Sequence, residues 1–138
     1  MPWLNKAETK SRKCWCGSIN CIETFISGPA IEKDFFEESN QKLKLEDIAK
    51  NDINEDLVSR KCINILINRT ARCLASVINI YDPEIIVLGG GVSNIDRLYT
   101  EIPKLWNKWI FSDECITKLV KAKFGDSSGV RGAAWLHD

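Results

Sequence analysis

The spacing of apolar residues predicts helices over much of the first half of the chain. Ile22, Phe25 and Ile26 recur at i, i+3 and i+4, which is the spacing of one helical face. Ser27 is placed to cap a following helix that carries Pro29 in its first turn. The stretch LKLEDIAKNDIN predicts a short helix and a turn, whereas the polar residues before the first helix predict a loop.

The longest periodic segment covers residues 54–80 and predicts one long helix. Its apolar residues form two stripes, the first made of Val58, Cys62, Leu66, Cys73, Val77 and Ile80, the second of Ile63, Ile67, Leu74 and Ile78. Apolar positions on two sides of a helix indicate burial against two partners. Pro83 then ends the helix, because a proline excludes the helical conformation at the preceding residue, Asp82.

Two apolar runs after this helix predict strands. Residues 85–88 are four consecutive large apolar residues, typical of a strand buried on both faces of a parallel sheet. Residues 118–124, KLVKAKF, are the second candidate. Helices alternate with these strands, so we predict an α/β fold with a small parallel sheet. Since a sheet of two strands is marginal in water, we expect this sheet to be incomplete.

Helices are expected between the two strands and after the second. The helix between them is marked by apolar residues at helical spacing: Leu98, Ile102, Leu105 and Trp109. Ser93 is placed to cap this helix, and Pro103 is expected to kink or split it. A final helical stretch covers residues 130–138.

The composition of the 138 residues is that of one globular domain: 44% are hydrophobic, 28% are charged and the formal net charge is zero. This balance gives no electrostatic reason to expect a nucleic acid or an acidic membrane as partner. No apolar run reaches the roughly 20 residues of a membrane helix, and the N-terminus has no secretory apolar segment. We therefore expect a cytoplasmic protein whose six cysteines are thiols or thiolate ligands.

Three of the cysteines, Cys14, Cys16 and Cys21, lie within eight residues of one another. Thiolates are ligands for zinc, and Gly17 allows a tight turn between the second and third sulfur. A structural zinc site normally has four ligands, however, and only three are present locally. The spacing alone leaves zinc binding and ordinary buried thiols open, while a C-x-x-C redox pair is absent.

Three glycines, Gly89, Gly90 and Gly91, follow the first predicted strand and precede a helix. Ligands of open α/β sheets bind outside the carboxyl ends of the strands, where glycine lets the backbone approach them. The run does not match a dinucleotide or Walker fingerprint, since Asn94 stands where the last glycine would be. A nucleotide-binding turn and a plain strand-to-helix turn both remain open.

The segment GDSSGVRGAAW, residues 125–135, has glycines on both sides of a polar loop. Its simplest interpretation is a turn followed by a helix whose small residues allow close packing. Arg131 near the start of that helix is a lesser candidate for a phosphate or ribose contact, and a surface arginine is the plainer alternative.

Taken together, three segments resemble the ROK family (repressors, open reading frames and sugar kinases). CWCGSINCIETFISGPAI is similar to the family's C-x-C-G-x-x-x-C-x-E-x-x-x-S-G segment. INIYDPEIIVLGGGVSNIDRLY resembles its D-P-x-x-I-V-L-G-G-G segment, and GDSSGVRGAAWL looks like its C-terminal signature. Within the family, the opening PW, the run CIETFISG and the ending DSSGVRGAAWL are most similar to bacterial fructokinases.

The resemblance implies an actin-like (ribonuclease H-like) ATPase fold, of which this chain would be the helix-rich C-terminal lobe with a zinc loop. It implies that Cys14, Cys16 and Cys21 are zinc ligands and that Glu23 contacts the sugar hydroxyls. We expect a single domain over residues 1–138, with a zinc loop region at 1–26 and a nucleotide-side lobe at 27–138.

The nucleotide site is implied in the same way. Gly89, Gly90, Gly91 and Val92 match the family loop that packs against the adenosine of ATP. The family's kinases use ATP and magnesium to phosphorylate a hexose hydroxyl, so Mg-ATP and a hexose are the expected ligands. The resemblance favours fructose as the hexose.

The family's remaining catalytic segments are expected upstream of these motifs. They are a D-x-G-G-T phosphate loop, an N-D segment whose aspartate is the general base, and an E-x-G-H segment whose histidine is the fourth zinc ligand. The sequence before Cys14 contains none of them. We therefore assign no catalytic residue to this chain, regard the N-terminal lobe as absent, and expect no phosphoryl transfer by the chain unaided.

Three alternatives to a fructokinase stay open. The chain is similar enough to the whole family to belong to an N-acetylglucosamine or glucose kinase, or to a ROK-type transcriptional repressor. A free-standing zinc-stabilised module is the third. If the chain is the C-terminal lobe of a sugar kinase, its uncovered apolar surface and sheet edge would favour self-association, such as a homodimer.

Overall fold

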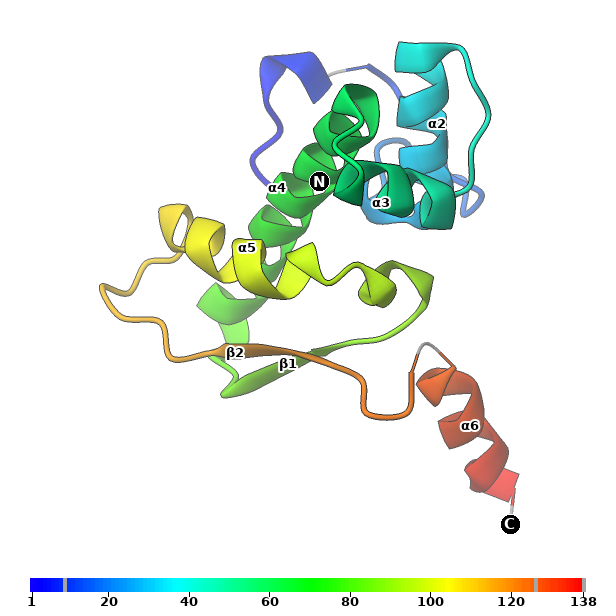
Figure 1. Cartoon of the computed structure of the whole chain (residues 1–138). Helices are drawn as coiled ribbons and strands as arrows, with labels where there is room; N and C mark the ends of the chain where they lie inside the picture. Colours follow the sequence, from blue (N-terminus) through cyan, green and yellow to red (C-terminus); the bar gives the residue numbers. More distant parts are fainter. Residues whose placement is uncertain (9, 126, 138) are drawn as a thin grey trace. The chain divides into compact units, whose positions relative to one another are not determined.

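The computed structural model describes residues 1–8, 10–125 and 127–137 (Figure 1). Its helices are α1 (Glu23–Ile26), α2 (Gly28–Ser39), α3 (Leu45–Ile53), α4 (Leu57–Tyr81), α5 (Arg97–Leu105) and α6 (Ser128–Ala134). Its strands are β1 (Ile85–Leu88) and β2 (Lys118–Lys121), and 3₁₀ turns are η1 (Lys6–Glu8), η2 (Gly91–Asn94), η3 (Trp106–Lys108) and η4 (Trp135–His137). The chain divides into two compact units, residues 1–73 and 74–138.

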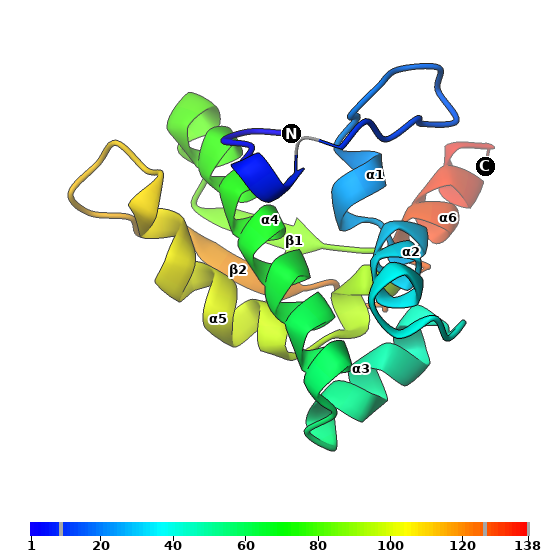
Figure 2. The same cartoon turned by 90° about the horizontal axis from the view of Figure 1, so that it is seen from above.

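The first unit is helical, and α2 begins where the sequence predicts, whereas α4 begins at Leu57 rather than at the predicted residue 54. The Ser27 hydroxyl accepts a hydrogen bond from the Ala30 N–H at 3.3 Å, and Pro29 lies in the first turn of α2. Helices α2 and α3 lie side by side in both views (Figures 1 and 2). Fully or nearly fully buried side chains come from each helix of this unit: Phe25, Ile31, Phe35, Ile48, Ile63, Leu66 and Ile67.

Helix α4 confirms the long periodic segment, but its two stripes are not buried along their whole length. Cys62 and Ile63 are buried, whereas Val77 is 40% and Ile80 is 74% exposed. The prediction of two buried stripes is therefore wrong for the last turns of the helix. The helix ends as expected: Asp82 before the proline has φ of 43°, a left-handed conformation that cannot continue the helix.

The second unit contains a two-stranded parallel sheet. Strands β1 and β2 pair in parallel, with Ile85 opposite Lys118 and Val87 opposite Val120. Helix α5 packs beside β2 (Figure 2). The small parallel sheet is confirmed, but the expected burial of β1 on both faces is wrong, since Ile85 is 54% and Val87 is 58% exposed. Within the described part of this unit, nothing covers that face.

Two details around α5 also differ from prediction. Ser93 does not cap α5: it lies in η2, and its hydroxyl donates to the Gly90 carbonyl at 2.7 Å. Helix α5 continues through Pro103 and ends at Leu105, because η3 follows, so Trp109 lies outside it. Strand β2 is also shorter than the predicted 118–124.

All six cysteines are free thiols, as expected from the sequence. Every helix in the described part of the chain is too short or too polar to span a bilayer.

Candidate functional site

The three clustered cysteines are held on a short hairpin. Lys13 and Ile19 form an antiparallel bridge, and the Cys14 N–H donates to the Ser18 carbonyl at 2.9 Å. At the tip, the Gly17 N–H donates to the Cys14 carbonyl at 3.0 Å, and Gly17 has φ of 87°. Only glycine adopts that backbone conformation without strain, so Gly17 shapes the turn as the sequence predicted.

The base of the hairpin is closed by Arg12 and Asn20. The Asn20 N–H donates to the Arg12 carbonyl at 2.8 Å, and the Arg12 N–H donates to the Asn20 side-chain oxygen at 2.9 Å. Asn20 has φ of 57°, which its short polar side chain tolerates. The polar stretch expected to be a plain loop therefore contains an ordered turn that fixes the cysteines.

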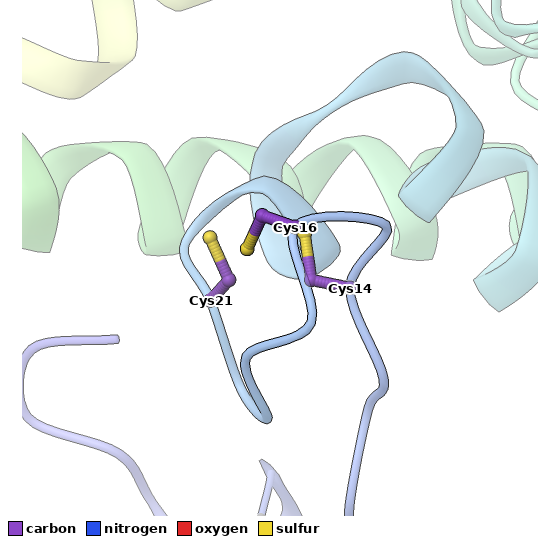
Figure 3. A group of neighbouring side chains, drawn as sticks. All are labelled: Cys14, Cys16 and Cys21. Carbon is purple, nitrogen blue, oxygen red and sulfur yellow. The ribbon is translucent and has the colours of Figure 1, made fainter.

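The three sulfur atoms of Cys14, Cys16 and Cys21 lie within 4.8 Å of one another (Figure 3). In a tetrahedral zinc site with Zn–S bonds of about 2.3 Å, ligand sulfurs are about 3.8 Å apart. A small contraction of the loop would therefore complete the ligand geometry. No fourth cysteine, histidine or carboxylate joins this group among the described residues. The cluster fits a thiolate metal such as zinc, with one coordination position left to another ligand.

The surroundings of Cys16 and Cys14 shift the pKa values of these two thiols in opposite directions. Hydrogen bonds from the backbone and side chain of Ser18 lower the pKa of Cys16 to about 7. The backbone N–H of Cys16 acts to lower the pKa of Cys14, but partial burial and the thiols of Cys16 and Cys21 outweigh it and raise that pKa. Cys16 consequently becomes an anion, and so a metal ligand, more readily than Cys14.

Glu23 is the first residue of α1 and is exposed. Its side chain lines a cavity of about 220 Å³ together with Cys14, Trp15 and Lys33. The cavity therefore joins the cysteine loop to α1 and α2, and it brings together the expected metal ligand Cys14 and the expected sugar contact Glu23. Their proximity follows from the short spacer between Cys21 and α1.

Helix α1 is held in place by a buried aromatic ring and two arginines. Phe25 is fully buried, and the guanidinium carbons of Arg12 and Arg69 lie 4.8 and 5.3 Å from its ring centroid. Arg12 also donates to the Thr24 carbonyl at 2.9 Å and pairs with Asp34 at 2.7 Å. These contacts position α1, and with it the Glu23 carboxylate.

Glu8 is a buried carboxylate that the sequence did not predict. It is 6% exposed and accepts hydrogen bonds from Arg69 at 2.8 Å and from Arg72 at 2.6 and 2.7 Å. Burial alone would raise the pKa of Glu8, but the hydrogen bonds from Arg72, Arg69 and the Asn5 N–H outweigh it and lower the pKa to about 2. A hint was available: Arg69 and Arg72 lie in the middle of the long helix, between the predicted apolar positions Ile67 and Cys73.

The glycine run lies in the second unit, at the carboxyl end of β1. Gly90 has φ of 78°, so the turn does require positive φ there. A Cβ atom added at Gly89, Gly90 or Gly91 would meet no other atom within 4 Å. The adjoining end of β2 lies at the same edge, because the Ala122 N–H donates to the Leu88 carbonyl at 3.1 Å. The turn presents open backbone where ligands of parallel sheets bind.

Residues 129–136, near the end of the chain, are all exposed, including Arg131. The close packing expected of the small residues in α6 is therefore not present in the described second unit. Asp126, in the 125–135 segment predicted to form a turn and a helix, lies outside the described residues. Arg131 thus stays a surface arginine with no contact that assigns it a role.

The sequence was compared with protein families and known proteins. The pattern of the ROK family matches residues 5–138. An N-acetyl-D-glucosamine kinase of Aliivibrio fischeri is 34% identical over 125 residues, which are 91% of this chain and 41% of that protein. The chain thus spans about 41% of the length of this curated relative.

Solved structures agree on the fold. A ROK family glucokinase from Streptomyces griseus, in complex with glucose and AMPPNP, superposes with a TM-score of 0.80 at 24% identity, over 90% of this chain and 46% of that one. A ROK family transcriptional regulator, a homolog of the E. coli MLC protein, has a TM-score of 0.70 at 22% identity, over 85% of this chain and 33% of that one. The family match over residues 5–138 and the 34% identical relative confirm the family resemblance seen in the three motifs.

Proposed function

The chain belongs to the ROK family, and we propose that it is the part of an ATP-dependent hexose kinase that holds the metal loop, one sugar-binding carboxylate and the glycine turn on the nucleotide side. One observation carries this proposal: Glu23 and the cysteine loop, which the family motif links in sequence, line a single cavity.

The substrate we propose is N-acetylglucosamine or glucose. The related kinases described above are an N-acetyl-D-glucosamine kinase and a glucokinase, so they favour these sugars over the fructose expected from the sequence. The similarity to fructokinases rests on short stretches such as CIETFISG, and these stretches build the loop and α1 rather than a complete sugar site. Glu23 would accept hydrogen bonds from the sugar hydroxyls, as the family motif implies.

Zinc is the metal we propose for Cys14, Cys16 and Cys21, because the three sulfurs already approach tetrahedral spacing. Bound there, zinc would crosslink the hairpin to the start of α1. Its role would be structural, since the chemistry of the kinase depends on Mg-ATP. A histidine from the rest of the larger protein would supply the fourth ligand, as the resemblance implies.

Gly89, Gly90, Gly91 and Val92 are proposed to pack against the adenosine of ATP. Open backbone around the glycines and the position at the carboxyl end of β1 support this role. The phosphates, the magnesium ion and the attacking hydroxyl would be positioned by the rest of the kinase.

A fusion experiment tests the proposal. The chain is joined to the part of the Aliivibrio fischeri relative outside the matched segment, and ATP-dependent phosphorylation of N-acetylglucosamine, glucose, mannose and fructose is measured. We expect activity in the fusion and none in the chain alone. Activity in the chain alone would contradict the proposal that the rest of the kinase positions the phosphates, the magnesium ion and the attacking hydroxyl. A folded, inactive fusion would contradict the kinase assignment.

A matched pair of variants assigns Glu23. In the active fusion, Glu23→Gln should raise the KM for the sugar by about tenfold and leave the KM for ATP unchanged, because it removes one charged hydrogen-bond acceptor. Glu46→Gln, an exposed carboxylate on α3, is the control. Equal loss of sugar and ATP use in Glu23→Gln would instead indicate misfolding.

A second candidate is a regulatory protein, because the transcriptional regulator shares this fold with a TM-score of 0.70. In that case the sugar cavity would serve as a sensor. Sugar binding without phosphorylation in any folded fusion would favour it over the kinase.

Self-association is also proposed. Ile85 and Val87 expose an apolar strand face, and the β1 edge has no strand partner within the described second unit. The rest of a larger protein or a second copy of the chain would cover this surface.

A further inference from the structure

We propose that Trp15 is a stacking platform for the sugar ring, and that the cavity beside it selects a glucose-configured pyranose over fructose. This inference rests on the proposed function in that it assumes a sugar beside Glu23. It adds a specificity-determining residue that the family motif leaves unassigned, since the motif has x at that position.

Trp15 is the large side chain best placed to meet a ligand on this loop. It is 89% exposed, although an indole ring of this size contributes most to stability when it is buried. Its backbone is nevertheless fixed: Trp15 follows Cys14 in the turn that the Gly17 N–H closes onto the Cys14 carbonyl at 3.0 Å. An exposed indole on a fixed turn is a surface prepared for contact, with little backbone entropy left to lose on binding.

The cavity beside Trp15 has the chemical groups that bind carbohydrate. Trp15 supplies an aromatic face, Glu23 accepts hydrogen bonds from hydroxyls, and Lys13 and Lys33 donate to hydroxyl or carbonyl oxygens. Its volume of about 220 Å³ is below the ~300 Å³ at which pockets for drug-sized ligands begin. The cavity therefore suits one sugar ring rather than a nucleotide.

The stacking surface gives the basis for selection. In a glucose-configured pyranose the ring hydroxyls or the acetamido group are equatorial, so axial C–H bonds are free to contact the indole face. In fructose and mannose an axial hydroxyl interrupts one of these faces. N-acetylglucosamine and glucose should therefore gain from Trp15, and fructose should gain less.

The test uses the whole chain, labelled with ¹⁵N, in a buffer that contains zinc. Each tryptophan gives one indole N–H signal, and the Trp15 signal is the one that Trp15→Ala removes. N-acetylglucosamine, glucose and fructose are titrated separately. We expect the Trp15 signal to shift with the first two sugars, and Trp15→Ala to weaken their Kd by about tenfold. Trp15→Phe should weaken it by only about threefold, because a smaller ring remains.

Trp135→Ala is the matched control, because Trp135 is also a highly exposed tryptophan, at 76%, but belongs to the other unit. It should leave every Kd unchanged. If sugars bind and Trp15→Ala binds them as tightly as the unaltered chain, the stacking role is refuted while the proposed function stands. A fructose Kd equal to or below that of N-acetylglucosamine refutes the selection. If no sugar shifts the Trp15 signal, the platform is refuted, whereas the sugar contact of Glu23 is decided separately by the sugar KM of Glu23→Gln in the fusion.

Discussion

Replacing Glu8 by glutamine tests how the first unit holds its candidate site. Glutamine keeps the shape of the side chain but removes the charge that Arg69 and Arg72 share at 2.6 to 2.8 Å. Both arginines are at most 5% exposed, so water cannot replace the interactions that their guanidinium groups lose. Arg69 also donates to the Phe25 carbonyl at 3.1 Å, which links the network to α1 and hence to Glu23.

The size of the effect follows from the pKa of Glu8. Arg72 and Arg69 outweigh burial and lower that pKa from 4.5 to about 2, and each pKa unit corresponds to about 1.4 kcal/mol. The charged carboxylate should therefore stabilise the fold by about 3 kcal/mol. Because the folded-state pKa is the lower one, this contribution is fully present above about pH 4.5 and is lost as the pH falls toward 2.

The assay is urea unfolding of the unaltered chain and Glu8→Gln, followed by circular dichroism at pH 7 and again near pH 4. Glu38→Gln is the control, because Glu38 makes a similar short pair with Lys61, at 2.6 Å, but at the surface. It should cost less than about 1 kcal/mol. We expect the difference in the free energy of unfolding between the unaltered chain and Glu8→Gln to be smaller near pH 4 than at pH 7. A loss no larger than that of Glu38→Gln would mean that desolvation cancels the attraction, and would refute the reasoning.

Three further predictions concern the loop, the glycine turn and the sheet. Cys16→Ser should lower both the zinc content, measured by elemental analysis, and the melting temperature. Cys115→Ser, outside the cluster, should change neither. If Cys16→Ser keeps its zinc, Cys16 is not a ligand of the site. Gly90→Ala should lower the free energy of unfolding in urea by about 1 to 2 kcal/mol, because Gly90 has φ of 78°. Gly89→Ala, at a position without positive φ, should lower it by less. Equal losses in the two variants would exclude backbone strain as the cause. Sedimentation at high concentration should show self-association that Val87→Lys reduces, and a monomer throughout would contradict an interface on this face.

Much of the fold was predictable because it depends on local chemistry. The Ser27 cap and the end of α4 before Pro83 follow from residues close together in sequence. The parallel pairing of β1 with β2 joins residues distant in sequence, such as Ile85 and Lys118, but the helix between the strands supplies the crossover that parallel strands require. The three cysteines were predictable as a group for the same reason, since a short hairpin with Gly17 at its tip brings them together.

What could not be predicted depends on contacts distant in sequence. Glu8 meets Arg69 and Arg72 across more than sixty positions, and no local pattern marks it as buried. The apolar run of β1 indicated burial on two faces, but hydrophobicity cannot say which partner covers a strand, and Val87 is exposed. Ser93 was misplaced because its spacing to α5 suited a cap, while the chain forms the η2 turn first.

The most direct test of the kinase account is a competition between sugars in the fusion with the Aliivibrio fischeri relative. Equal concentrations of N-acetylglucosamine, glucose and ¹³C-labelled fructose are supplied with ATP and magnesium, and the phosphorylated products are separated by mass. The account predicts that phosphorylated N-acetylglucosamine or glucose dominates, and that Glu23→Gln lowers its yield. Phosphorylated fructose as the main product, or no phosphorylated sugar from a folded fusion, would contradict it.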